Sequence, residues 1–244
     1  MRFATPPMIL ATVPFLSLLG CVDLSPTRVV DEVQQTLDAG GIESLRVTQG
    51  MGDMEIRGDD AATAITMTVT LLGPEGSDRD LDASRDLIVD LQSDNGVAKA
   101  LAILDDVEIG YSMRVLMTVP SRLLVEVRDG SGDLTISRVN GLFLDDESGD
   151  IWIDELSGGL TVVDGSGDLD INGVIGAIDI LDGSGDMDVY GVDGDVTIED
   201  GSGDIRASQI TGEVRVTDGS GDIVLREVGD VSIVEDGSGD VRIQ

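Results

Sequence analysis

A five-residue stretch, Asp-Gly-Ser-Gly-Asp, recurs in the second half of the chain at a fixed interval. It occupies residues 164–168, 182–186, 200–204, 218–222 and 236–240, so each copy lies eighteen residues after the one before it. Two related Ser-Gly-Asp turns precede the series, at 131–133 and 148–150. A fixed period of this length indicates a repeat architecture in which each unit stacks on its neighbours.

Each unit of eighteen contains a half-step of about nine, marked by glycine or asparagine. The second and fourth residues after each mark are apolar, and the residue between them is polar in ten of the thirteen half-steps. This alternation predicts a short strand with one buried face. The predicted inward pairs are Leu134/Ile136, Leu142/Leu144, Ile151/Ile153, Leu160/Val162, Leu169/Ile171, Ile178/Ile180, Met187/Val189, Val196/Ile198, Ile205/Ala207, Val214/Val216, Ile223/Leu225, Val231/Ile233 and Val241/Ile243.

Two such strands make one coil, and a short strand cannot bury its apolar face alone. Successive coils must therefore stack, each strand pairing in parallel with the equivalent strand of the next coil. The predicted fold is all-β, a parallel β-helix or β-solenoid with about eighteen residues per coil and two short strands per coil. A β-propeller would need units of about forty residues, which the spacing excludes.

Residues 42–128 keep the β character but lose the regular period. A degenerate turn, "GMGD", precedes Met54 and Ile56 in the apolar places, and 64–72 and 111–120 alternate like strands. The stretch 77–91 predicts a short helix capped by Ser77 and then a strand. We therefore expect one domain over 42–244, in which 42–128 is an irregular half that caps the first end and 129–244 holds the regular repeats.

The N-terminus is a separate object. A mostly apolar run ends in Leu18-Leu19-Gly20-Cys21, which resembles a bacterial lipobox. The run is too short to span a bilayer and suits a secretory signal. We predict a lipoprotein signal peptide at 1–20, lipidation of Cys21, which is the only cysteine, and a tether over 21–41. Val22 is not the aspartate that resembles an inner-membrane retention signal of Gram-negative lipoproteins, so an outer-membrane anchor is favoured if the source is Gram-negative.

The order of these features resembles a known family. A strand and "GD" turn near the start, a strand ending in Thr118-Val119-Pro120, and a run of "GSGD" turns are similar to the bacterial putative-adhesin domain, an envelope domain of unknown function. The resemblance covers about 42–244. It implies a parallel β-helical fold and an envelope location, and it brings no catalytic or binding residues.

Composition narrows the function further. The formal net charge is −33. Because such a chain repels nucleic acid phosphates, we predict that it does not bind nucleic acid. The chain has no histidine, and beyond the signal its aromatic residues are Tyr111, Phe143, Trp152 and Tyr190. A carbohydrate-active enzyme on a β-helix is therefore the least favoured class, and we assign no catalytic residue, cofactor or metal ligand. Phe143 and Trp152 are expected outward on opposite sheets, where they contact a ligand or lie under a neighbouring loop.

Calcium β-rolls also repeat glycine and aspartate every nine residues. Their register differs, because here Gly167 is followed directly by Asp168 and then by inward Leu169. Glycine supplies positive φ in such turns, and serine and aspartate bond the turn backbone. We therefore predict a non-enzymatic envelope lipoprotein that presents a solenoid for binding, adhesion or structural support to an envelope glycan or protein. The alternative is an acidic, Ca²⁺-binding structural protein of the envelope.

The two aspartates of each turn are expected to stack as two columns. Their members are Asp129, Asp146, Asp164, Asp182, Asp200, Asp218 and Asp236 in one, and Asp133, Asp150, Asp168, Asp186, Asp204, Asp222 and Asp240 in the other. Like charges about 4.8 Å apart repel. We expect relief from turn N–H groups and the intervening serines, and a melting temperature that rises with NaCl and more steeply with CaCl₂.

The last predicted pair, Val241/Ile243, is followed only by Gln244. An open terminal coil exposes its apolar interior and a strand edge. We therefore expect either a cap contributed by residues 42–128 or an end-to-end contact between two copies.

Overall fold

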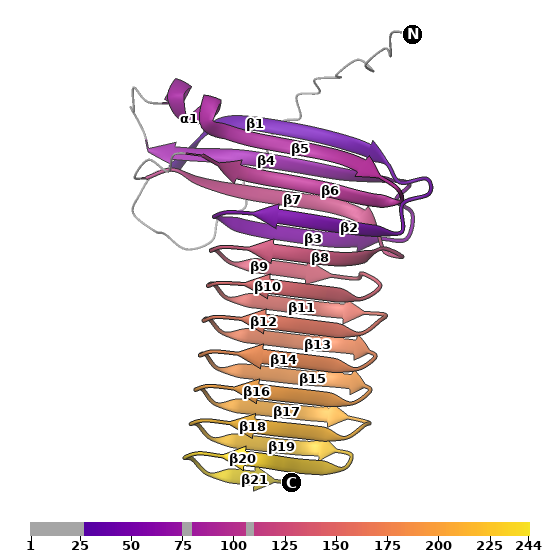
Figure 1. Ribbon diagram of the computed structural model, residues 1–244, viewed down its shortest axis with the longest axis vertical. Coiled ribbons are helices and arrows are strands. Elements are labelled where there is room, and N and C mark those ends of the chain that lie inside the picture. Colours follow the sequence, from indigo (N-terminus) through magenta and orange to yellow (C-terminus); the bar gives the residue numbers. More distant parts are fainter. Residues whose placement is uncertain (1–26, 75–79, 106–109) are drawn as a thin grey trace.

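The computed structural model describes residues 27–74, 80–105 and 110–244. It is a rod of stacked strands whose first end carries longer, antiparallel strands (Figure 1). The predicted all-β parallel solenoid is confirmed. The predicted signal peptide, Cys21 and Ser77 lie outside the described residues.

Two sheets run the length of the rod. Within the described residues, sheet 1 has eleven strands and sheet 2 has ten. In spatial order, sheet 1 is β1 (Thr27–Asp38), β4 (Ala64–Pro74), β7 (Ser112–Pro120), β3 (Asp53–Asp59), β9 (Leu134–Ser137), β11 (Ile151–Leu156), β13 (Leu169–Ile175), β15 (Met187–Asp193), β17 (Ile205–Ile210), β19 (Ile223–Val228) and β21 (Val241–Ile243). Sheet 2 is β20 (Val231–Asp236), β18 (Val214–Asp218), β16 (Val196–Asp200), β14 (Ile178–Asp182), β12 (Leu160–Asp164), β10 (Leu142–Asp146), β8 (Leu124–Asp129), β2 (Ser44–Gln49), β6 (Val97–Leu104) and β5 (Leu87–Asp94).

Parallel pairing joins residues that hold the same place in successive coils. Leu169 of β13 pairs with Met187 of β15, and Ile178 of β14 pairs with Val196 of β16, each eighteen residues further on. Most of the predicted inward pairs are buried, including Leu169, Ile171, Ile178 and Ile180. The interior is therefore a narrow apolar slab between the two sheets.

Sheet 1 has a third inward place that simple alternation does not predict. It is filled by Val139, Leu156, Val174, Val192 and Ile210, which are all buried. The residue before each has a left-handed backbone, with φ between 55° and 71° at Arg138, Glu155, Gly173, Gly191 and Gln209. One left-handed residue shifts the phase of the strand, so the next side chain turns inward instead of outward.

The first end of the rod is closed by antiparallel strands. β1 pairs with β4, β4 pairs with β7, and β5 pairs with β6, all antiparallel. The predicted helix followed by a strand is confirmed as α1 (Asp80–Asp86) and β5. The tether prediction for 21–41 is wrong over Thr27–Asp38, because these residues form β1 along the whole of β4.

The regular stack begins earlier than the sequence predicts. β2 pairs in parallel with β8, and β3 pairs in parallel with β9. Met54 and Ile56 are buried in the same inward places as Leu134 and Ile136. The description of 42–128 as irregular is therefore wrong for residues 44–59, which form a coil of the solenoid itself.

The opposite end of the rod is open. The side chains of Val241 and Ile243 are 39% and 57% exposed. The described residues of 42–128 lie at the other end (Figure 1). A cap from those residues over the last coil is therefore wrong, because β4, β5 and β6 are used to close the first coil. The end-to-end contact stays a prediction.

Candidate functional site

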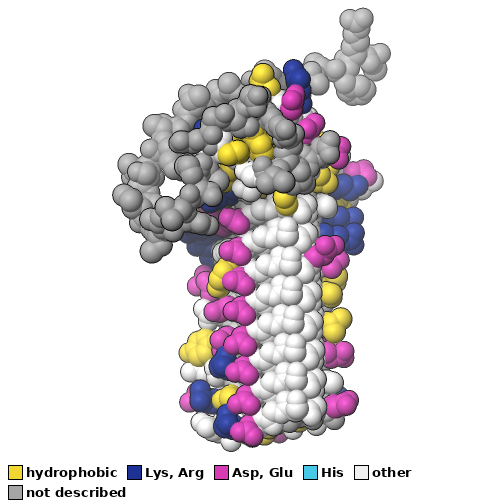
Figure 2. Space-filling model, turned by 90° about the vertical axis from the view of Figure 1, so that its left-hand side faces the viewer, with side chains coloured by type: hydrophobic (Ala, Val, Ile, Leu, Met, Phe, Trp, Pro, Cys, Tyr) yellow, Lys and Arg dark blue, Asp and Glu magenta, His cyan; other side chains and the backbone are white. Residues whose placement is uncertain are grey.

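The Gly-Ser-Gly turns join sheet 2 to sheet 1 and stack directly on one another. The second glycine of each turn has φ near 150°, as at Gly185 and Gly203, and its N–H donates to the serine carbonyl of the next coil. A Cβ at Gly185 would overlap the carbonyl oxygen of Gly167. Only glycine lets the turns approach this closely. The stacked turns form a pale band down the rod, with a row of acidic side chains beside it (Figure 2).

The first aspartate of each repeat does not lie in the turn, where the sequence interpretation placed it. It ends the sheet 2 strand at the third inward place, after two apolar residues such as Ile178 and Ile180. We call these residues the inner column. Their exposure lies between 1% and 7% for Asp129, Asp146, Asp164, Asp182, Asp200 and Asp218. The predicted stacking is confirmed, since Asp146 pairs with Asp164 and Asp164 with Asp182.

Four of the inner carboxylates have one well-placed donor, namely those of Asp164, Asp182, Asp200 and Asp218. The N–H of Ser166, Ser184 and Ser202 donates to Oδ1 of the aspartate two residues earlier, at 3.3, 3.2 and 3.1 Å. Oδ2 of Asp164, Asp182 and Asp200 is buried and has no hydrogen-bond partner among the described residues. The predicted backbone relief is therefore present at these residues, where it satisfies one of the two oxygens, whereas at Asp129 and Asp146 neither buried oxygen has a partner among the described residues.

Burial of the inner column shifts its protonation. Removal from water raises the pKa of Asp164, Asp182 and Asp200 to about 6, and the charge of the preceding inner aspartate adds to the shift. Burial likewise raises the pKa of Asp146 to about 6 and that of Asp129 to about 7. These carboxyls titrate close to neutral pH.

The closing aspartate of each turn forms the outer column, whose side chains are largely exposed. Oδ1 of Asp150, Asp168 and Asp186 accepts the backbone N–H of the next outer aspartate at 3.0 Å. The serine hydroxyls contribute little, since Ser148 Oγ lies 3.5 Å from its acceptor, the Gly130 carbonyl. Relief therefore comes from the backbone.

Two arginines reinforce the open half of the outer column. Arg206 pairs with Asp186 at 3.6 Å and with Asp204 at 2.9 Å. Arg242 pairs with Asp222 at 3.1 Å and with Asp240 at 2.7 Å. The pKa of Asp222 is lowered, first by the N–H of Asp240 and then by the hydrogen bond from Arg242.

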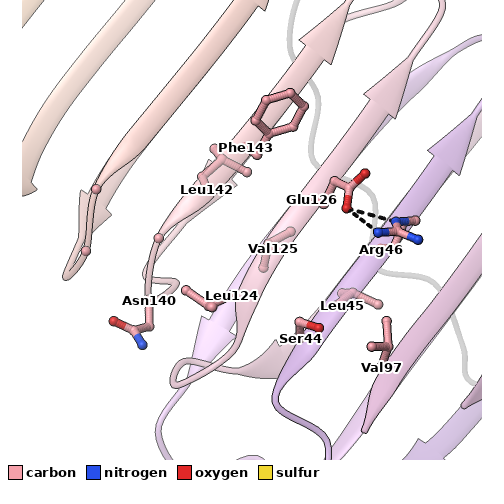
Figure 3. Close-up of a pocket in the computed structure, with 13 residues that line it drawn as sticks. Ser44, Leu45, Arg46, Val97, Leu124, Val125, Glu126, Asn140, Leu142 and Phe143 are labelled. Carbon is pink, nitrogen blue, oxygen red and sulfur yellow. Dashed lines mark hydrogen bonds and ion pairs between the residues drawn. The ribbon is translucent and has the colours of Figure 1, made fainter. Parts of the chain in front are cut away.

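Phe143 and Trp152 lie on opposite sheets, as predicted, and each is 41% exposed. Phe143 borders a hollow of about 440 Å³ on sheet 2, together with Leu124. The Arg46 Nε atom donates to Glu126 at 2.8 Å beside it (Figure 3). The sequence analysis did not predict this hollow. One signal was present, because Leu124 occupies a position that is glycine in the next two coils, at Gly141 and Gly159.

Membrane-spanning helices and side-chain clusters that could hold a metal ion are both absent from the described residues. In residues 27–74, 80–105 and 110–244, no helix is both long enough and apolar enough to cross a membrane. In the same ranges, no three or more His, Cys, Asp or Glu side chains are gathered so that they could hold a metal ion. The stacked carboxylates form lines along the rod.

Comparison with known proteins agrees with this architecture. The chain is similar to a putative adhesin from Bacteroides fragilis, with 15% identity, a TM-score of 0.55, and coverage of 88% of this chain and 97% of that one. A putative adhesin from Parabacteroides distasonis gives 15% identity, a TM-score of 0.52 and the same coverages. A search of curated proteins found no match. The Toastrack DUF4097 family matches residues 42–244, and the chain therefore belongs to this family.

Proposed function

We propose that this chain is a lipid-anchored protein of the bacterial envelope that presents its solenoid as a non-enzymatic binding scaffold. The observation that supports this most is the contrast between the two sides of each strand. The inward residues keep the same chemical type from coil to coil. By contrast, the residue type changes along one outward row of sheet 2, which consists of Phe143, Thr161, Asp179, Thr197 and Arg215. A purely structural rod has no need of such varied outward chemistry.

Family and neighbours support the same proposal. The similar solved structures are described as putative adhesins, which is consistent with a surface that contacts other envelope components. A glycan or a protein of the envelope is the partner that we propose. The hollow beside Phe143 offers an apolar wall, backbone groups and a charged pair, a mixture typical of small-ligand sites.

A binding array tests the scaffold role. The chain carrying Cys21→Ser should be applied to arrays of glycans and matrix proteins, with Phe143→Ala and Trp152→Ala made separately in it. Because the two rings lie on opposite faces, a specific ligand should lose binding with one variant and keep it with the other. Equal binding by both variants and the parent on every positive spot would contradict a ligand site on either face.

The proposed anchor is the lipid on Cys21. The first described strand, β1, begins at Thr27, so only residues 22–26 would separate the anchor from the capped end of the rod. In this arrangement the capped end faces the bilayer and the open coil points away from it. A single acyl group binds a membrane only weakly, so the multiple acyl chains of a processed lipoprotein are needed for stable attachment.

Cys21→Ser should release the protein from the membrane fraction, because the thiol that carries the lipid is lost. The measurement is partitioning between membrane and soluble fractions after cell lysis. Ser25→Ala, which alters a neighbouring residue and keeps the cysteine, should stay with the membranes. Unchanged partitioning of Cys21→Ser would rule out this anchor.

The alternative role in cation binding has one supporting observation. Among the residues described, ion pairs reach Asp186, Asp204, Asp222 and Asp240 of the outer column but not Asp133, Asp150 or Asp168. The exposed carboxylates nearest the cap therefore have no arginine partner there. Counter-ions should gather along this half of the column as a diffuse, weakly selective layer.

The melting temperature should rise with NaCl, and more steeply with millimolar CaCl₂, because a divalent ion screens two neighbouring carboxylates at once. The measurement is a thermal melt in chelator, NaCl and CaCl₂ at matched ionic strength. Arg206→Gln removes the pairs with Asp186 and Asp204 and should steepen both responses. If both salts raise the melting temperature equally, charge screening alone explains the effect. If neither salt changes it, hydrogen bonds alone stabilise the stacked carboxylates.

A further inference from the structure

The inner column poses a charge problem that the outer column does not. Successive inner aspartates lie one rung apart, about 4.8 Å, inside the apolar slab. The first residues of the sheet 1 strands that follow the turns, such as Leu169, Met187 and Ile205, are apolar and buried. A column of buried, ionised carboxylates would place one negative charge on every rung away from water.

From Asp129 to Asp200, the charged groups that shift the pKa of the inner carboxyls are all acidic. Besides the column itself they are Asp53, Asp145, Glu147 and Asp150. Arg128, which precedes Asp129, pairs with Glu126 and Asp145, and Arg206 and Arg242 pair with exposed carboxylates of the outer column. Neutralisation must therefore come from something other than an ion pair.

The capped end of the column shows which partner is missing. Thr48 pairs with Arg128, so the next residue, Gln49, precedes Asp129 in the column. Gln49 is 3% exposed, and its Nε2 donates to the carbonyl oxygens of Met51, at 3.1 Å, and Gly52. These two bonds identify the amide nitrogen. Its Oε1 is then a buried acceptor with no partner among the described residues.

The atoms of the column that lack a hydrogen-bond partner are thus all acceptors. The buried Oδ2 atoms of Asp164, Asp182 and Asp200 and the Oε1 atom of Gln49 all lack a donor among the described residues. An ionised carboxylate is acceptor-only, whereas a protonated one supplies an O–H donor. A proton on a carboxyl group of the column would therefore create a donor that the geometry lacks.

We propose that the inner column is a proton-binding site, in which neighbouring carboxyl groups hold protons from solvent and donate hydrogen bonds along the rod toward the buried amide oxygen of Gln49. The ligand is the proton, and the column binds it when the chain folds. The rung spacing suits this, because a carboxyl aligned with the rod axis brings one oxygen toward the next rung. The proposal is independent of any external partner.

The direction of the pH effect follows from the raised pKa values. The pKa is about 6 at Asp146, Asp164, Asp182 and Asp200 and about 7 at Asp129, against 3.8 for a solvated aspartate. Between these limits the folded chain binds more protons than the unfolded chain, so stability falls as pH rises through this window. From pH 5 to pH 8, each aspartate with a pKa of about 6 should lower the folding equilibrium constant by about tenfold, and Asp129 should lower it by about a hundredfold.

The test compares two triple variants with the same change in charge. Asp164→Asn, Asp182→Asn and Asp200→Asn alter the inner column, and Asp168→Asn, Asp186→Asn and Asp204→Asn alter the outer column in the same coils. Asparagine keeps the Oδ1 acceptor in both. Denaturant unfolding at pH 5, 6, 7 and 8, at fixed ionic strength, should show the fall in stability in the parent and the outer variant. The inner variant should lose the three tenfold steps of the replaced aspartates and keep the contributions of Asp129 and Asp146.

A direct measurement keeps the test decisive if the inner variant fails to fold. The ¹³C carboxyl resonances of aspartate in the unmodified protein should show a set that titrates between pH 6 and pH 7, and Asp182→Asn alone should remove one member. Titration of every resonance near 4, or stability that is flat or rising from pH 5 to pH 8, would overturn the proposal. So would a dependence at pH 8 on one added metal ion that the inner variant loses, since a cation would then occupy the column.

Discussion

Alanine in place of Gly185 should destabilise the solenoid by at least about 3 kcal/mol, because strain and steric overlap act together. The new Cβ would overlap the carbonyl oxygen of Gly167 in the preceding turn, and φ at this position is 149°. The overlap is with backbone, so no side chain can move aside to relieve it. These two coils would have to separate and lose the hydrogen bond from Gly167 N–H to Ser184 O. Denaturant unfolding measures the loss.

A second glycine gives the matched control. Gly159 lies in the turns on the other side of the coil, and a Cβ there would lie 3.2 Å from the Ala177 carbonyl oxygen. Ala177 holds the same place in the next coil, so this turn accepts a methyl group. Gly159→Ala should change stability by less than about 1 kcal/mol. If both variants lose a similar free energy of unfolding, the Gly-Ser-Gly turns are not packed more closely than the turns on the other side of the coil.

The solenoid could be predicted from sequence because its repeat and its strand alternation agree. A nine-residue half-step sets the turns, and apolar pairs such as Leu169/Ile171 set the buried face. Parallel stacking follows, since such a strand has no other way to bury that face. The observed register, Leu169 with Met187 and Ile178 with Val196, is the one that the eighteen-residue period requires.

The third inward place of sheet 1 was missed because a left-handed residue breaks the period of two. At Gly173 and Gly191 the glycine gives a visible signal for such a residue. At Glu155 and Gln209 the same conformation is taken by side chains that carry no such signal. Alternation alone would have turned Leu156 and Ile210 outward, whereas both are buried.

The inner column was misplaced for a different reason. Aspartate beside glycine and serine is typical of turns, and that local chemistry assigned Asp182 to the turn. The period of two predicts otherwise, because Ile178 and Ile180 are inward and Asp182 is the next residue of that face. The signal was present in the sequence, but the cost of burying a carboxyl argued against it.

The first end was harder to predict, because its outermost strand has little apolar pattern. No described side chain of β1 is fully buried. A strand that closes a solenoid needs one moderately apolar face and one polar face, and "TRVVDEVQQTLD" meets that need without a clear period. Its length, which matches β4 along the whole strand, is decided by tertiary pairing.

Truncation of one buried isoleucine in mid-rod should cost about 2–5 kcal/mol, because the cavity adds to the lost transfer free energy. Ile171 is fully buried in β13, between Ile153 and Val189 of the adjoining coils. Ile171→Ala removes contacts on both sides. The free energy of unfolding in denaturant, measured at low protein concentration, gives the loss.

Ile243→Ala is the matched variant, since Ile243 holds the same place in the last coil and is 57% exposed. At low concentration this change should cost less than about 1 kcal/mol, because little apolar area leaves the interior. If open coils associate end to end, Ile243 becomes buried in the contact, and the cost of its truncation should grow with protein concentration. If the cost is small at every concentration and scattering shows monomers, the end-to-end association is contradicted. If the cost equals that of Ile171→Ala at every dilution, the last coil is covered within one chain.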